Sequence, residues 1–139
     1  MVVPCCRGMT QTERVTLAIG ESLIQCNAFA LHLAYQNQSR TYDFSVFPRI
    51  HAADVPYSFF NGEPTDGFGI PINTTIAQTM QSYFVDFAMV GTKPGSSATA
   101  FPVYTAQAKT LNISGVGDFV VTDPAANKRC RFWVEGLYS

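Results

Sequence analysis

Charged side chains are scarce in this sequence of 139 residues. Asp, Glu, Lys and Arg make up only 14% of the chain, whereas a typical soluble domain contains about 25%. The formal net charge is −1 and no long run of one sign occurs, which argues against nucleic acid as a partner. Solubility must therefore depend on something other than charge. Attached glycans would provide it, and so would burial of part of this surface in a larger fold.

A membrane-spanning run and a secretory leader are also missing. We find no apolar stretch long enough to span a membrane, and the segment from Met1 to Arg7 has no basic flank before its short apolar run. Three Asn-x-Ser/Thr sequons nevertheless favour a secreted, extracellular parent. Sequons typical of a secreted protein, together with the lack of a signal peptide, predict that Met1 is not the native beginning. The sequon asparagines are Asn37, Asn73 and Asn112.

Metal-binding motifs are lacking as well. The sequence contains no Cys-x-x-Cys and no His-x-x-x-His, so neither a zinc site nor another metal site is expected. Of the four cysteines, Cys5 and Cys6 are adjacent, and the sequence leaves open whether they are free or paired. No internal repeat and no second domain is recognisable, and 139 residues are enough for one domain with a core.

Two long apolar periods predict helices. Thr10 to Glu13 has capping-box spacing, and apolar residues then recur every three or four positions, which predicts a helix from about residue 13 to about residue 35. Gly20 weakens the middle of this helix and favours a break there. A second helix begins after Asn73 as its cap and ends at Gly91, with Pro94 just beyond.

Short strands and one more helix complete the pattern. Tyr42, Phe44 and Val46 alternate with polar residues, which predicts a strand that Pro48 ends. The residues from Glu63 to Pro71 are rich in Gly and Pro and predict an exposed loop. Two further strands are expected at 111–113 and 119–121. A last helix is expected from about Pro124, with Cys130, Trp133 and Leu137 on one face.

Two histidines are present, His32 and His51. The pKa of imidazole lies near neutrality, so the ring can accept and return a proton at physiological pH. His51 follows the predicted strand and Pro48, and a loop just past the end of a strand is a common place for an exposed proton-transfer group. His32 lies in a helical period between Leu31 and Leu33, and we expect an ordinary helical histidine that faces solvent or a groove.

The residues from Gly20 to Ile24 begin like the Gly-x-Ser-x-Gly motif of a nucleophile elbow. That elbow needs a small residue at its last position, because strand and helix approach closely there. Ile24 occupies the position here, and the surrounding period is helical with no strand leading in. We therefore expect Ser22 to be an ordinary helical serine.

The loop that begins at His51 resembles the catalytic-histidine loop of fungal type-B carboxylesterases, relatives of the cholinesterases. In that family the His is followed by two small or polar residues, an acidic residue, an aliphatic residue, a Tyr and a Phe. Further motifs in the family's order extend the resemblance to the C-terminus, whereas residues 1–10 match nothing. The matching residues are His51, Asp54, Val55, Tyr57 and Phe59, the run from Gln81 to Pro94, Phe101-Pro102-Val103-Tyr104 and Cys130-Arg131-Phe132-Trp133.

The resemblance implies an α/β fold with helices packed on a few strands, in which residues 1–139 form the C-terminal part of an α/β-hydrolase domain. It also implies a carboxylic ester hydrolase, a carboxylesterase or lipase, that acts on small-molecule or lipid esters without a cofactor. In such enzymes the histidine takes the proton of a serine that attacks the ester carbonyl, and it later activates the water that hydrolyses the acyl-enzyme. His51 is therefore the expected general acid–base.

The remaining catalytic groups are expected outside these residues. α/β-Hydrolases carry the triad in the order Ser, Asp or Glu, His along the chain, and this sequence has no Gly-x-Ser-x-Gly and no Gly-Gly pair. We therefore expect the isolated chain to be inactive. Asp54 corresponds to an acidic residue that accompanies the family's histidine without belonging to the triad, so its expected role is to order the loop.

Cys26 and Cys130 match family positions that are paired in a disulfide. The resemblance therefore implies a disulfide between them, which requires their Cα atoms to lie within about 7 Å.

A different class of function also stays open, because cholinesterase-like domains also serve as non-catalytic binding or adhesion modules, and loss of the serine-containing part would leave such a module or a pseudo-enzyme. Retention of His51 favours an enzymatic parent over such a module.

Overall fold

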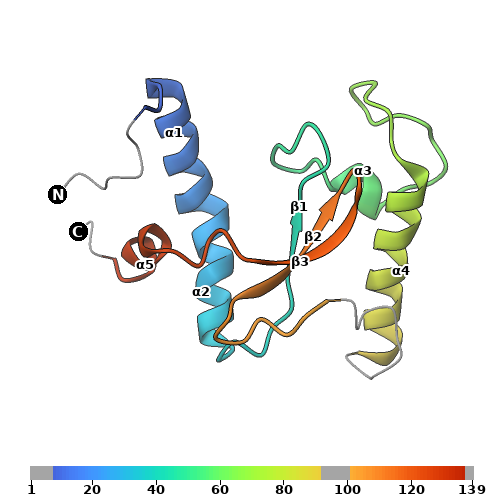
Figure 1. Ribbon diagram of the computed structural model, residues 1–139. Coiled ribbons are helices and arrows are strands. Elements are labelled where there is room, and N and C mark those ends of the chain that lie inside the picture. Colours follow the sequence, from blue (N-terminus) through green and yellow to red (C-terminus); the bar gives the residue numbers. More distant parts are fainter. Residues whose placement is uncertain (1–7, 92–100, 137–139) are drawn as a thin grey trace.

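The computed structural model describes residues 8–91 and 101–136. Cys5, Cys6, Pro94 and Leu137 lie outside the described residues. Helices and a small sheet alternate along the chain, as the sequence predicted (Figure 1). In order, the elements are α1 (Gln11–Gly20), the π-helical segment η2 (Glu21–Gln25), α2 (Cys26–Ala34), β1 (Tyr42–Phe44), α3 (Val55–Ser58), α4 (Thr74–Val90), β2 (Lys109–Ser114), β3 (Gly117–Thr122) and α5 (Lys128–Val134).

The three strands form one mixed sheet in the order β1-β2-β3. β1 and β2 are parallel, with Tyr42 opposite Leu111, and β2 and β3 form an antiparallel hairpin. Since β1 and β2 run in the same direction, their carboxyl ends meet at one edge of the sheet. The segment that leaves this edge after β1 contains His51.

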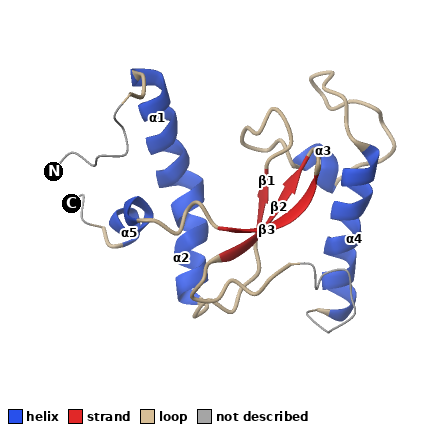
Figure 2. Cartoon of the chain, viewed as in Figure 1, coloured by secondary structure: helices blue, strands red, loops and turns tan. Residues whose placement is uncertain are grey.

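Hydrophobic residues gather on two sides of the sheet. Figure 2 shows the strands between the long helix of α1 and α2 and the separate helix α4. Leu111 and Ile113 of β2 pack with Ala77 and Met80 of α4. The second cluster joins α2 to α5 and contains the buried residues Cys26, Phe29, Tyr104, Ala108, Ala125 and Cys130.

One continuous helix from Gln11 to Ala34 confirms the first predicted helix, although its middle differs. The Thr10 hydroxyl accepts from the Glu13 backbone, and the Thr10 N–H donates to Glu13 Oε2 at 2.7 Å, so the capping box is confirmed. The bonds that the Thr10 N–H and the Thr10 hydroxyl donate to the Glu13 carboxylate hold its pKa below the usual range. The turns after Gly20 widen to π geometry without interrupting the helix.

The same helix corrects the statement that no segment is long enough to span a membrane. This helix has 24 residues and reaches a mean hydropathy of 1.2 over its most apolar window, so by length and composition alone it could cross a membrane. Within the fold, however, Glu21 and Cys26 tie the helix to α5 through an ion pair and a disulfide. Part of its apolar stripe faces outward, since Val15, Ile19 and Leu23 are exposed.

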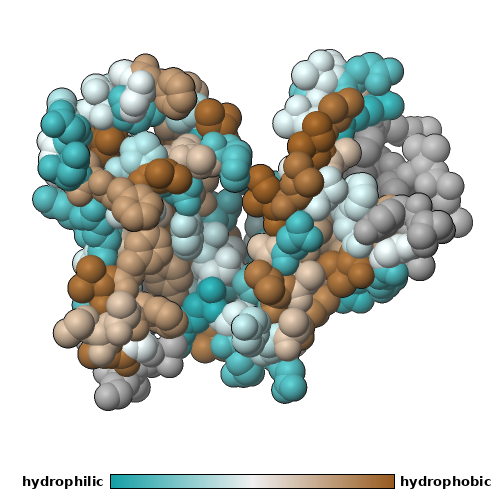
Figure 3. Space-filling model, turned by 180° about the vertical axis from the view of Figure 1, so that it is seen from behind, coloured by the Kyte–Doolittle hydropathy of each residue, from teal (hydrophilic) through white to brown (hydrophobic). Residues whose placement is uncertain are grey.

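Seen from behind, the molecule is hollowed at its upper edge, and apolar residues run along one wall of the hollow, on the right in this view (Figure 3). Exposed apolar side chains also occur on the other elements, including Val85, Phe87 and Met89 of α4 and Phe119 and Val120 of β3. Large exposed apolar patches occur at contacts with other proteins or membranes and at ligand-binding grooves.

The element boundaries agree with the sequence where a local signal sets them. Asn73 caps α4 by accepting from Thr75 and Ile76, and Gly91 ends that helix at φ 62°. Both predicted strands of the hairpin are present but longer. The last helix begins at Lys128 instead of about residue 124, because Asn127 is its cap and Asp123 closes a turn before it.

Candidate functional site

His51 lies in a turn beyond the carboxyl end of β1, and its side chain is exposed. The expected location is therefore confirmed, although the strand ends at Phe44, earlier than predicted. No described residue forms a hydrogen bond with its ring. The imidazole is thus accessible to a partner that comes from outside the described chain.

The segment before His51 is fixed to β1 by an ion pair. Arg49 Nη2 lies 3.0 Å from Asp43 Oδ2, and the same oxygen accepts from Asn112 Nδ2 of β2 at 3.2 Å. Arg49 and Ala52 both have left-handed backbone, with φ of 56° and 66°. Non-glycine residues adopt this region at a cost, so surrounding contacts must hold the loop in its shape.

The segment after His51 is also fixed to β1. Tyr42 donates its hydroxyl to Asp54 Oδ2 at 2.7 Å. Burial and this hydrogen bond raise the pKa of Tyr42 far above its usual value, so the phenol stays a donor. The carboxylate of Asp54 thus has a structural partner on β1.

A short helix that the sequence did not predict completes the support. α3 begins one residue after Asp54, and its Tyr57 is buried with its ring 5.0 Å from that of Phe44. Gln81 of α4 donates to the carbonyls of Ser58 and Phe60 at 3.3 and 2.8 Å, which holds the end of α3. The His51 turn therefore lies between two anchors on β1 and a third on α4.

The supporting roles of these residues were not predicted from the sequence, and only Tyr42 gave a partial signal. The alternation around Tyr42 predicted a strand but not the partner of its hydroxyl. Arg49, Asp43 and Gln81 carry no local motif, because their roles depend on contacts between distant segments.

His32 corrects the sequence-based expectation. It lies in α2 as predicted, yet it is only 6% exposed and faces neither solvent nor an open groove. Its ring stacks on that of Tyr104 at 4.0 Å, and Nδ1 lies 2.7 Å from Ser39 Oγ. Burial lowers the pKa of His32, while the charge of Asp123 acts in the opposite direction. The expectation failed because the chain after α2 returns across this face of the helix.

Ser22 is an ordinary helical serine, as expected. It lies in η2, and its hydroxyl donates to the carbonyl of Ile19, three residues earlier in the same helix, at 3.3 Å. No strand leads into this segment, so the strained strand-to-helix turn of a nucleophile elbow is absent from the described residues around it.

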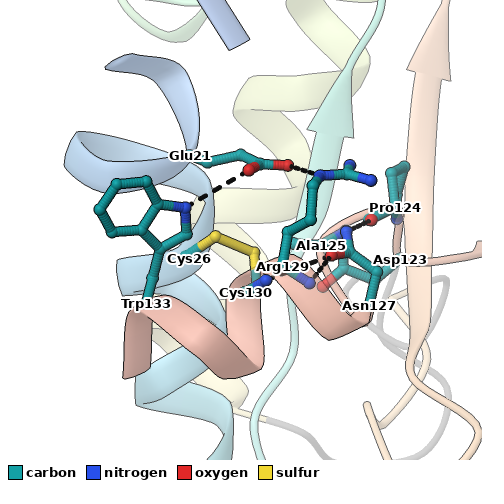
Figure 4. A network of polar contacts seen from close by, with 9 residues as sticks. All are labelled: Glu21, Cys26, Asp123, Pro124, Ala125, Asn127, Arg129, Cys130 and Trp133. Carbon is teal, nitrogen blue, oxygen red and sulfur yellow. Dashed lines mark hydrogen bonds and ion pairs between the residues drawn. A yellow bond between two sulfur atoms is a disulfide. The ribbon is translucent and has the colours of Figure 1, made fainter. Parts of the chain in front are cut away.

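The predicted disulfide between Cys26 and Cys130 is present, with Cα atoms 4.8 Å apart. Beside it, the nearly buried carboxylate of Glu21 accepts from Arg129 Nε at 2.5 Å and from Trp133 Nε1 at 3.4 Å (Figure 4). A buried charge is tolerated when it is paired and hydrogen-bonded. The covalent link and the ion pair thus hold α5 against the long helix at adjacent points.

The three sequon asparagines have different surroundings. Asn73 is exposed, and only its Oδ1 is used, as the cap of α4. Asn37 is half-buried with left-handed backbone. Asn112 lies in the central strand, where its Nδ2 already donates to Asp43. Glycosylation acts on that nitrogen, so Asn112 is the least suited of the three in the folded chain.

The described residues contain no group of three His, Cys, Asp or Glu side chains arranged to hold a metal ion. Taken together, the described chain is α/β in class, with helices around a three-stranded mixed sheet and an exposed, anchored histidine beyond the carboxyl ends of its parallel strands.

Comparison with known proteins gives two curated relatives. The chain is 32% identical over 124 residues to carboxylesterase patB of Aspergillus clavatus and 32% identical over 126 residues to carboxylesterase patB of Penicillium expansum. Each match covers 89% of this chain but 22% of the relative. The chain thus spans about a fifth of the length of the curated relatives it matches, which is consistent with a portion of a carboxylesterase. No protein-family model matches the chain. No solved structure matches it significantly.

Proposed function

We propose that this chain is the C-terminal portion of a type-B carboxylesterase of the α/β-hydrolase fold, and that His51 is its general acid–base. The similarity to two carboxylesterases supports the ester chemistry. The observation that carries the role of His51 is its placement, exposed and anchored beyond the carboxyl ends of β1 and β2. Side chains from separate segments converge at that edge in α/β folds.

In the proposed mechanism, His51 removes the proton from a serine hydroxyl as the serine attacks the ester carbonyl of a small-molecule or lipid ester. The protonated ring then donates to the departing alcohol, and the neutral ring activates water to release the acid. The serine, the triad acid and the oxyanion donors belong to the longer protein. Asp54 orients the loop, because its carboxylate already accepts the hydroxyl of Tyr42.

The exposed apolar surface supports the proposal that this chain packs against more of the same fold. Val15, Ile19 and Leu23 follow one face of the long helix, and each is more than half exposed. Full burial of a large apolar side chain is worth about 1.5–3 kcal/mol relative to full exposure, and these side chains, about half exposed, stand to gain roughly half of that. The sequons at Asn37 and Asn73 support the further proposal that the longer protein is secreted and glycosylated.

A chimaera tests the proposal directly. The segment of the Penicillium expansum carboxylesterase that aligns with this chain is replaced by residues 8–139, and hydrolysis of short-chain aryl esters is measured. We expect the chimaera to be active and the His51→Ala variant to lose kcat by about six orders of magnitude, because the serine loses its base.

The matched control is His32→Gln, which changes the other histidine. This variant should retain kcat in the folded chimaera, because His32 is buried against Tyr104. Added imidazole should restore part of the activity of His51→Ala. Near-normal turnover by a folded His51→Ala chimaera would refute the assigned role.

A further inference from the structure

A second feature of the fold lies at the other end of β1 from His51. A cavity of about 440 Å³ opens between the residues that lead from α2 into β1 and the C-terminal half of α4. This volume falls in the range of about 300–1,000 Å³ that small-molecule sites occupy. Among the described residues it is lined by Tyr35, Gln38, Ser39, Arg40, Tyr42, Tyr83, Phe84, Phe87 and Phe101.

Aromatic rings dominate the walls of this cavity, and they support one another. The ring of Phe101 meets Tyr83 edge-on at 5.1 Å and Tyr42 at 6.1 Å, and Phe84 lies 6.0 Å from Tyr42. Such pairs restrict the positions of their rings, which favours a cavity that is largely formed before a ligand binds. The cavity is therefore suited to a flat apolar group.

The tyrosine hydroxyls of the wall are already used as donors. Tyr42 donates to Asp54, and Tyr83 donates to Asp118 at 2.8 Å. Burial and that second bond raise the pKa of Tyr83 to about 12, so its phenol stays protonated at neutral pH. Neither hydroxyl hydrogen is left to bind a ligand.

Arg40 is the charged group of the lining. One of its terminal nitrogens, Nη1, donates to the carbonyl of Phe101. Within the described ranges, no carboxylate pairs with it. A guanidinium has five donors in a planar fork that matches a carboxylate. The cavity therefore combines apolar walls with a positive group that still has donors to offer.

We propose that this cavity binds an aromatic monocarboxylate, with the ring of the ligand against Phe84 and Phe87 and its carboxylate on Arg40. Charge decides between this ligand and the other molecules that aromatic walls accept. Aromatic cages also bind quaternary ammonium groups, but Arg40 repels a cation. A neutral aromatic molecule would fill the walls and leave the guanidinium without a counter-charge.

The test compares two isosteric probes on the 139-residue chain by isothermal titration calorimetry. 2-Naphthoate carries the carboxylate, and 2-naphthamide replaces it with a neutral amide of the same shape. We expect the naphthoate to bind about tenfold tighter or more, the gain typical of a charge-assisted hydrogen bond. Arg40→Gln should remove this preference, and Arg40→Lys should restore part of it.

A second pair of variants tests the walls. Phe87→Ala removes one lining ring and should weaken the binding of both probes. Val85→Ala is the matched control, since Val85 lies on the same helix, is exposed to a similar extent, 59% against 54%, and does not line the cavity. It should leave both affinities unchanged.

Equal affinities for the two probes on the unaltered chain would overturn the proposal. So would the absence of saturable naphthoate binding, or equal weakening by Val85→Ala and Phe87→Ala. The comparison on the unaltered chain needs no variant to fold. The outcome is independent of esterase activity, because the cavity does not include His51.

Discussion

Three tyrosine–aspartate pairs occur among the described residues, two of them partly buried and one exposed. In each pair the phenol donates its hydroxyl to the carboxylate at 2.6–2.8 Å. A partly buried Tyr hydroxyl needs an acceptor, and a charged acceptor gives the stronger bond. The bonded residues are 12, 35 and 19 positions apart along the chain. The pairs are Tyr42–Asp54, Tyr83–Asp118 and Tyr104–Asp123.

Removing one such hydroxyl should be costly where the ring is buried. We expect Tyr104→Phe to lower the free energy of unfolding by about 1.5–3 kcal/mol, because Asp123 loses its donor and Tyr104 is 1% exposed. Tyr35→Phe is the control, since that ring is largely exposed. Urea unfolding followed by circular dichroism measures both. Equal stability of Tyr104→Phe and the unaltered chain would contradict the pair's contribution.

His32 should make stability depend on pH. Burial lowers the pKa of His32 from its ordinary value of about 6.5, so the unfolded chain binds the proton more readily than the folded chain. The contribution of His32 is therefore complete above about pH 7 and is lost as pH falls below 6.5 toward the lower folded pKa. We expect the free energy of unfolding to decrease between pH 7.5 and pH 5.5.

The measurement is urea unfolding at several pH values in that window. His32→Gln should flatten the dependence, because it removes the titrating ring and keeps hydrogen-bonding groups near Ser39. His51→Gln is the control, and it should retain the slope, since His51 is exposed. Identical slopes for His32→Gln and the unaltered chain would assign the pH dependence to other groups.

Among the elements, α5 depends most on one covalent bond. Seven residues make a helix too short to be stable alone, and the Cys26–Cys130 disulfide closes a separation of 104 residues. We expect reduction to lower the free energy of unfolding by up to about 4–5 kcal/mol in the chain-entropy model. Glu21 and Arg129 remain to hold α5.

Urea unfolding with and without reductant measures this loss. Reduction keeps both side chains, so it separates the loss of the cross-link from the loss of packing that Cys26→Ala would add. The Cys26→Ala/Cys130→Ala variant should then show no further response to reductant. An unchanged midpoint on reduction of the original chain would contradict the prediction.

The sequence predicted those elements whose signals are local. The capping box at Thr10, the cap at Asn73 and the glycine at Gly91 depend on neighbouring residues, and the structure confirms all three. α3 was missed because four residues carry too little periodicity to predict a helix. The start of α5 was misplaced because both Asp123 and Asn127 can close a turn.

The position of the candidate site was predicted, but the contacts that hold its loop were not. The location of His51 follows from the end of a strand, which is a local signal. The contacts that anchor its loop have no local signal. Tyr42, Asp43 and Gln81 meet the segments that flank His51 only after β1 has paired and α4 has packed. The burial of His32 escaped prediction for the same reason, since Tyr104 covers it from a distance of 72 positions along the chain.

For the whole molecule, the absence of a nucleophile motif has a direct consequence. We expect the purified chain to hydrolyse p-nitrophenyl acetate no faster than free imidazole does, because the serine and the oxyanion donors supply most of the rate in such enzymes. Ser22→Ala should leave this rate unchanged. Turnover above the imidazole rate that disappears in Ser22→Ala would reverse the interpretation of that serine.

The pairing of β1 with β2 lies inside the loop that the disulfide closes. Tyr42 is opposite Leu111, and these residues are enclosed by Cys26 and Cys130. The entropy lost on closing a loop grows with its length, so closing the inner loop first shortens the path between the two thiols. Assembly should therefore proceed outward, with the strands pairing in the reduced chain and the thiols meeting afterwards. Air oxidation of the reduced protein would then report on the sheet, because a variant such as Ile113→Asp, which disrupts strand packing, should form the bond more slowly.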